Sequence, residues 1–66
     1  MNNQPQTLIR RSQVERRTGL ACSSIYARIA TGEFPKPVPL GGRNVAWVES
    51  EVDAWINERI QLRDEA

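Results

Sequence analysis

Apolar and polar residues along the 66-residue chain recur at spacings that predict short helices and a β-hairpin. Residues 7–9 are apolar and predict a short extended strand or brace. Ser12 and Glu15 have the spacing of a helix capping box, so we expect a first helix over about 13–17. Gly19 suits the left-handed residue that ends such a helix.

A second helix is predicted over about 22–30, only a few residues after the first. Ile25 and Ile29 are four residues apart, so they share one helix face, which we expect to point into the core. Gly32 marks the end of this helix. Two helices joined by a short turn that contains glycine have the spacing of a helix-turn-helix unit.

The segment after the second helix holds three prolines between residues 34 and 40, which exclude a helix and predict an extended chain. Residues 41–44 then have turn composition, and residues 45–48 have strand composition. Together they predict a β-hairpin of two short strands with a glycine-rich tip.

A third helix is predicted to begin near Ser50. Its apolar residues follow the spacing of one helix face: Val52, Trp55, Ile56 and Ile60. The predicted fold class is therefore α+β and mostly α, a winged helix-turn-helix with the hairpin between the second and third helices. We expect one such domain over residues 7–63, a flexible tail over 1–6 and a frayed end over 64–66.

Composition narrows the class of protein. Apolar residues make up 39% and charged residues 26%, as in a soluble globular domain. The single cysteine, Cys22, and the absence of histidine exclude an internal disulfide and argue against a zinc site or any other metal. These features favour the cytoplasm, and no apolar run is long enough to span a membrane.

Catalytic motifs are missing from the sequence. The chain has no histidine for a catalytic triad, no G-x-S-x-G elbow and no phosphate-binding glycine loop. Cys22 lacks the usual activating base and is interpreted as a small, partly buried residue. We therefore expect no catalytic residues, no cofactor and no small-molecule substrate.

Charge is unevenly distributed, although the net charge is only +1. Residues 1–43 carry seven basic and two acidic side chains, a net of +5, whereas residues 44–66 carry two basic and six acidic ones, a net of −4. This asymmetry can create a positive face opposite a negative one. The alternative is that the two halves interleave in space and form an ordinary mixed surface.

The second helix and the hairpin carry the chemistry expected of a DNA-binding surface. With Ile25 and Ile29 inward, small polar residues face outward on the second helix, and a long cation, Arg43, lies at the hairpin tip. Arg10, Arg11, Arg16 and Arg17 flank the first helix, which in a helix-turn-helix crosses the DNA backbone. The candidate DNA contacts are Arg11, Arg16, Arg17, Ser23, Ser24, Tyr26, Ala27, Arg28, Thr31, Lys36, Arg43 and Asn44.

Several motifs in the chain resemble one family. They are Thr18-Gly19-Leu20, Ser23-Ser24-Ile25-Tyr26, Gly32-Glu33-Phe34-Pro35-Lys36-Pro37-Val38, Leu40-Gly41-Gly42-Arg43, Trp47, and Glu49-Ser50-Glu51-Val52-Asp53-Ala54-Trp55-Ile56. This pattern, over residues 8–59, resembles the AlpA-type prophage regulators, which are related to phage excisionases and to the winged-helix domains of MerR-type regulators.

The resemblance implies that the second helix enters the major groove and that the hairpin contacts the minor groove. It implies either a transcription regulator of a mobile element or a recombination directionality factor that bends DNA beside an integrase. By this resemblance Ser23, Ser24, Tyr26 and Arg28 fall on the recognition helix and Arg43 on the wing.

The chain departs from the family pattern at four positions of the second helix region. Family members commonly carry serine in place of Ala21, arginine in place of Cys22, and arginine or lysine in place of Ala27 and Ala30. The second helix is therefore less basic than the pattern implies, and Arg28 compensates only in part.

A protein-interaction module is the alternative from another functional class. The acidic third helix, with Glu58, Asp64 and Glu65, is a candidate docking surface for an integrase or a response regulator. A single winged domain buries a limited area on DNA, so cooperative binding with other copies or binding with a partner is also expected.

Overall fold

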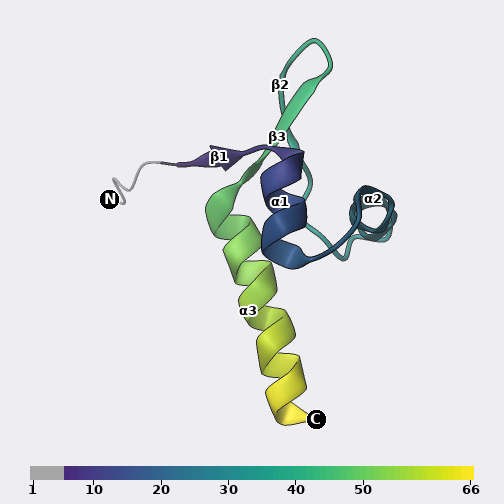
Figure 1. Cartoon of the computed structure of the whole chain (residues 1–66), viewed down its shortest axis with the longest axis vertical. Helices are drawn as coiled ribbons and strands as arrows, with labels where there is room; N and C mark the ends of the chain where they lie inside the picture. Colours follow the sequence, from purple (N-terminus) through teal and green to yellow (C-terminus); the bar gives the residue numbers. More distant parts are fainter. Residues whose placement is uncertain (1–5) are drawn as a thin grey trace.

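A computed structural model describes residues 6–66 and shows three helices arranged around one small sheet (Figure 1). Its elements are β1 (Leu8–Ile9), α1 (Arg11–Thr18), α2 (Cys22–Ala30), β2 (Val38–Gly41), β3 (Asn44–Val48) and α3 (Glu49–Glu65). The predicted fold class, α+β and mostly α with a hairpin between the second and third helices, is confirmed. The tail predicted over residues 1–6 lies, except for Gln6, outside the described residues.

The sheet is antiparallel, and its strand order is β1-β3-β2. The predicted hairpin is formed by β2 and β3, in which Val38 lies opposite Ala46. The apolar segment near the N-terminus becomes a third strand, because Ile9 lies opposite Trp47 on the other edge of β3. The central strand is therefore held from both sides.

The hairpin of residues 38–48, here called the wing, projects from the body at the end opposite the C-terminus of α3 (Figure 1). Gly42 has a φ of 58° at its tip, a left-handed value that favours glycine, and it allows the tight turn that carries Arg43. A register shift between Pro39 and Gly41 adds a bulge on the edge strand, where a proline is tolerated.

The hydrophobic core takes one side chain from almost every element. Its buried cluster consists of Ile9, Val14, Ile25, Phe34, Trp47 and Val52. Ile25 is fully buried, as its spacing predicts, and Ile29 packs partly buried against the cluster. Ile60, which the same reasoning places on the apolar face of α3, is 42% exposed, because this helix continues beyond the body of the domain (Figure 1).

Helix α1 does not begin as the sequence predicts. The predicted capping box of Ser12 and Glu15 is wrong. The helix starts at Arg11, and its N-cap residue is Arg10, which follows the last residue of β1. The backbone N–H of Arg10 donates to Gln13 Oε1 at 3.0 Å, so a glutamine side chain closes the first turn. Glu15 instead pairs with Arg11 at 3.3 Å.

Two tryptophans hold the connection between α2 and the wing. The indole N–H of Trp47 donates to the carbonyl of Pro35 at 3.0 Å, and that of Trp55 donates to the carbonyl of Glu33 at 2.7 Å. Phe34 lies between these two carbonyls and packs edge-on against Trp55, with 4.9 Å between ring centroids. Each indole thus has a hydrogen-bond acceptor, and the proline-rich connection is tied to both β3 and α3.

Helix α3 begins directly after β3, one residue before the predicted start at Ser50. Glu49 and Glu51 lie in its first turn, where negative charge is favoured by the helix dipole. The helix continues to Glu65, so two of the three residues predicted to fray belong to its last turn.

Replacement of Ile25 by alanine tests the core. Because Ile25 is fully buried, we expect Ile25→Ala to lower the free energy of unfolding by about 2–5 kcal/mol in urea denaturation. Ile60→Ala is the matched control on an exposed helix face, and its effect should stay within about 0.5 kcal/mol. Similar losses for the two variants would contradict this description of the core.

Candidate nucleic-acid interface

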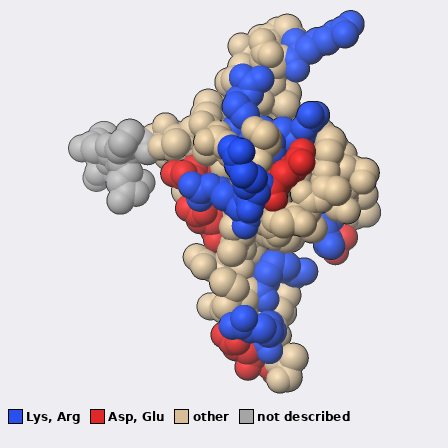
Figure 2. Space-filling view, viewed as in Figure 1, with Lys and Arg blue, Asp and Glu red and all other residues tan. Residues whose placement is uncertain are grey.

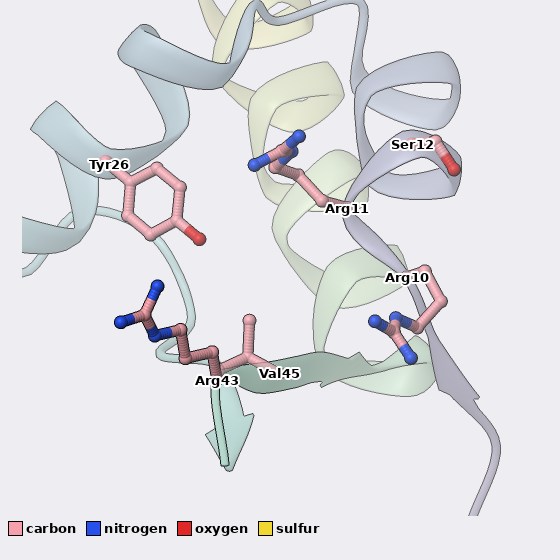
Figure 3. Close-up of a pocket in the computed structure, with 6 residues that line it drawn as sticks. All are labelled: Arg10, Arg11, Ser12, Tyr26, Arg43 and Val45. Carbon is pink, nitrogen blue, oxygen red and sulfur yellow. The ribbon is translucent and has the colours of Figure 1, made fainter. Parts of the chain in front are cut away.

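A cleft with a volume of about 330 Å³ lies between the start of α1, α2 and the wing (Figure 3). We call it the basic cleft; its lining consists of Arg10, Arg11, Ser12, Tyr26, Arg43 and Val45. Three of these six side chains are arginines, and none is acidic. The fold therefore brings together cations that are up to 33 positions apart in the sequence, from Arg10 to Arg43.

Each wall of the basic cleft is positioned by a different part of the fold. Arg10 is the N-cap of α1, and Arg43 comes from the turn of the wing. Tyr26 projects from α2, and its ring packs edge-on against Trp47 with 6.2 Å between ring centroids. Figure 3 shows the Tyr26 hydroxyl and the Arg43 guanidinium bordering the same space, with Arg10 on its opposite side.

The arginines of the basic cleft differ in how far they are neutralised. Arg11 pairs with Glu15 at 3.3 Å, which reduces its local field. Within residues 6–66, the guanidinium groups of Arg10 and Arg43 form neither a hydrogen bond nor an ion pair. These two cations are therefore free to bind an anion.

The outward face of α2 is built from small or uncharged residues. Ser23 and Ala27 are exposed, and Thr31 is exposed just after the helix, as predicted; Tyr26, expected on the flank of this face, is exposed as well. Ser24, predicted to face outward, is half-buried. The exposed residues allow the helix backbone to approach another surface closely.

Arg28 lies closer to the core than the sequence predicts. It follows Ile25 by three residues, so about 60° of helix rotation separates the two side chains. The residue is half-buried, and among residues 6–66 its Nε is a buried atom without a hydrogen-bond partner.

Arg17, another predicted DNA contact, is exposed but forms ion pairs with two carboxylates of the same chain. Its guanidinium donates to Glu49 Oε2 at 2.5 Å and to Asp53 Oδ1 at 2.8 Å, so it links α1 to α3. The basic and acidic halves of the sequence therefore interleave at this point. Figure 2 shows acidic groups beside the basic ones over the centre of the molecule, while the projecting wing carries basic groups.

The remaining candidate contacts are exposed and lie outside α2 and the basic cleft. Arg16 and Lys36 are exposed on α1 and on the connection before β2, and Asn44 is exposed at the start of β3. Arg10, which the candidate set leaves out, proves to line the basic cleft together with Ser12 and Val45. The signal in the sequence was the Arg10-Arg11 pair beside a predicted helix start.

Comparison with known proteins identifies the family. Residues 7–60 match the family described as the prophage CP4-57 regulatory protein (AlpA). The chain belongs to this family. The predicted resemblance to AlpA-type prophage regulators is thereby confirmed.

Two relatives of this chain show how far the similarity extends. The DNA-binding transcriptional activator AlpA of Escherichia coli (strain K12) is 33% identical over an alignment of 69 positions, which covers 94% of this chain and 99% of that protein. The uncharacterized protein ORF88 of Enterobacteria phage P4 is 58% identical over 45 residues, which cover 68% of this chain. The matched part spans 51%, about half, of the phage protein.

Neither a membrane span nor a metal cluster is found in the described part of this AlpA family chain. No helix within residues 6–66 has the length and apolar character needed to cross a bilayer. The same residues contain no group of three or more histidine, cysteine, aspartate or glutamate side chains suited to a metal ion. The expected lack of a cofactor stays a prediction.

Arg17 and Arg16, neighbours in the last turn of α1, provide a matched test of the link to α3. We expect Arg17→Gln to lower the free energy of unfolding by up to about 1 kcal/mol, because its two ion pairs are partly exposed. The loss should shrink as salt is raised. Arg16→Gln should leave the urea midpoint unchanged, and equal effects of the two variants would refute the assignment.

Proposed function

We propose that this chain binds duplex DNA and regulates transcription of a prophage or a related mobile element. The observation that carries the proposal is the basic cleft, which joins the exposed face of α2 to the wing. Membership in a family of prophage regulatory proteins supports this role, as does the relative named as a DNA-binding transcriptional activator. No small-molecule substrate and no catalytic step are part of the proposal.

The proposed docking places α2 in the major groove and the wing along the minor groove. An α-helix fits the major groove, and small side chains such as Ser23 and Ala27 allow its backbone to come close to the base edges. The wing projects from the body, so its tip can lie along the adjacent minor groove, where Arg43 can reach the phosphates of the backbone (Figure 1).

Affinity would come mainly from neutralised phosphates. The cations available for this are exposed or line the cleft: Arg10, Arg11, Arg16, Lys36 and Arg43. Arg17 contributes less because two carboxylates hold it, and Arg28 contributes less because it is half-buried. Five cations limit one domain to modest affinity, so we expect adjacent copies or a partner protein on natural sites.

Base recognition by α2 would rest on apolar and hydroxyl contacts. Its exposed residues, Ser23, Tyr26, Ala27 and Ala30, include no arginine, lysine, asparagine or glutamine. These absent side chains are the ones that form two hydrogen bonds with guanine or adenine. Alanine methyl groups instead pack against the 5-methyl group of thymine, so we expect thymines in the contacted stretch.

Two other roles are supported by particular features of the chain. An excision factor would use this DNA-binding face beside an integrase. A protein-docking role is favoured by the C-terminal part of α3, which extends away from the body and exposes Ile60 and Leu62 by 42% and 49% (Figure 1). Glu58, Asp64 and Glu65 are also exposed there.

Salt-dependent binding of duplex DNA tests the main proposal. Fluorescence anisotropy with duplexes selected from a random pool should give a slope of log K against log salt of about −3 to −4.5, for three to five neutralised phosphates. Arg43→Gln should weaken binding and reduce the size of that slope by about 0.9, the loss of one phosphate contact.

Arg63→Gln is the control, because Arg63 lies in the last turn of α3 and pairs with Asp64 at 2.9 Å. This variant should bind like the parent protein. If the protein binds no duplex even at low salt, DNA binding is refuted, and protein docking through α3 becomes the leading role.

Replacement of thymine by uracil tests the proposed readout. Each contacted thymine that loses its methyl group should cost about 0.8 kcal/mol, or about fourfold in affinity, the value of one buried CH₂ group. The measurement is a set of single thymine-to-uracil duplexes in the selected site. Retained affinity across the whole site, or a selected site without thymine, would show that α2 reads bases in another way.

A further inference from the structure

We propose that the basic cleft binds a single phosphate of the DNA backbone and that this contact sets the register of the domain on the duplex. The inference rests on the proposed function and adds one defined site to it. It also assigns a role to Arg10 and to the hydroxyl of Tyr26, as direct ligands of that phosphate.

The cleft has room for a phosphodiester group. Its volume of about 330 Å³ is roughly ten times the ~30 Å³ that one water molecule occupies in the liquid. Its lining comes from the β1–α1 junction, α2 and the wing, so a group bound there contacts three separate segments at once (Figure 3).

The donors around the cleft suit an anion with several oxygen atoms. The guanidinium groups of Arg10 and Arg43 are free of partners among residues 6–66, and their planar arrangement of N–H groups matches the geometry of phosphate. The Tyr26 hydroxyl adds a neutral donor. No carboxylate lines the cleft, and the carboxylate of Glu15, which pairs with the lining residue Arg11, is not part of the lining.

The start of α1 adds a further attraction. Arg11 and Ser12, the first two residues of this helix, both line the cleft. The first N–H groups of a helix lack carbonyl partners within the helix and favour a phosphate nearby. Here the helix N-terminus adds to a site that the arginines already define.

The cleft is largely formed before DNA arrives. The hydrogen bond from the Arg10 N–H to Gln13 Oε1 fixes the backbone at that wall, and the contact of Tyr26 with Trp47 fixes the ring at another. A preformed site loses less conformational entropy on binding. Because the cleft lies between α2 and the wing, its phosphate would lie between the two grooves that these elements enter, and phosphate contacts position a protein on DNA.

Methylphosphonate scanning tests this site with the full chain. A selected duplex is synthesised with one backbone phosphate at a time replaced by an uncharged methylphosphonate, and affinity is measured by anisotropy. We expect one position per bound domain at which affinity falls about tenfold or more, as for the loss of hydrogen bonds to a charged group. Other contacted phosphates should give smaller losses.

Combining the modified phosphate with single side-chain substitutions tests whether that phosphate lies in the basic cleft. At the sensitive position, Tyr26→Phe and Arg10→Gln should add little to the loss caused by methylphosphonate, since each change removes the same contact. Tyr26→Phe keeps the ring against Trp47, so its urea midpoint should equal that of the parent protein. Arg63→Gln, remote from the cleft, should remain strictly additive.

The outcomes separate this inference from the proposed function. If the parent protein binds the selected duplex in a salt-dependent manner but every methylphosphonate has the same small effect, the single-phosphate site is refuted and DNA binding stands. Additive losses with both Tyr26→Phe and Arg10→Gln would likewise overturn it. If the unmodified duplex is not bound at all, the proposed function itself fails.

Discussion

The burial of Trp47 is the interaction on which the rest of this small domain depends. The residue lies on the central strand, is fully buried, and its indole N–H donates to Pro35. Its ring contacts Tyr26 of α2, and its strand neighbours are β1 and β2. One side chain thus relates α2, the wing and the N-terminal strand to each other, and a chain of 66 residues has few other large side chains to do so.

This arrangement explains why the candidate interface is continuous. Tyr26 and Val45 both border the basic cleft. The ring of Tyr26 contacts the ring of Trp47, and Val45 lies two residues before Trp47 on β3 and packs against the core. A shift of the wing relative to α2 would therefore disturb the core as well. The two surfaces proposed to enter neighbouring grooves are held at a set separation by packing, and the space between them is the basic cleft.

Arginines with the same intrinsic chemistry acquire different roles from their neighbours. Arg17 meets two carboxylates from α3 and becomes a link between helices, whereas Arg10 and Arg43 have no such partner within residues 6–66 and keep their charge available. A net charge of +1 consequently says little about binding of an anion. The local field depends on which charges the fold brings within a few ångströms of one another.

Local spacing was sufficient to predict most of the elements. The positions of Ile25 and Ile29, the prolines after Phe34 and the turn around Gly42 predicted the two helices and the wing, because these patterns determine backbone dihedral angles and helix faces within a few residues. The apolar spacing of α3 was also correct, but its last member, Ile60, proved exposed, since periodicity does not reveal where the neighbouring core ends.

Tertiary structure decided what local spacing could not. Ser12 has good capping chemistry, yet α1 starts earlier because β1 pairs with β3 and delivers Arg10 to the helix N-terminus in an extended conformation. The partners of Arg17 lie 32 and 36 positions away, and the basic cleft joins Arg10 to Arg43. The sequence alone determined the family, the elements and the outward chemistry of α2. Which arginines remain unpaired within residues 6–66 was decided largely by packing, because the ion pairs of Arg17 form with carboxylates that only the folded chain brings near it.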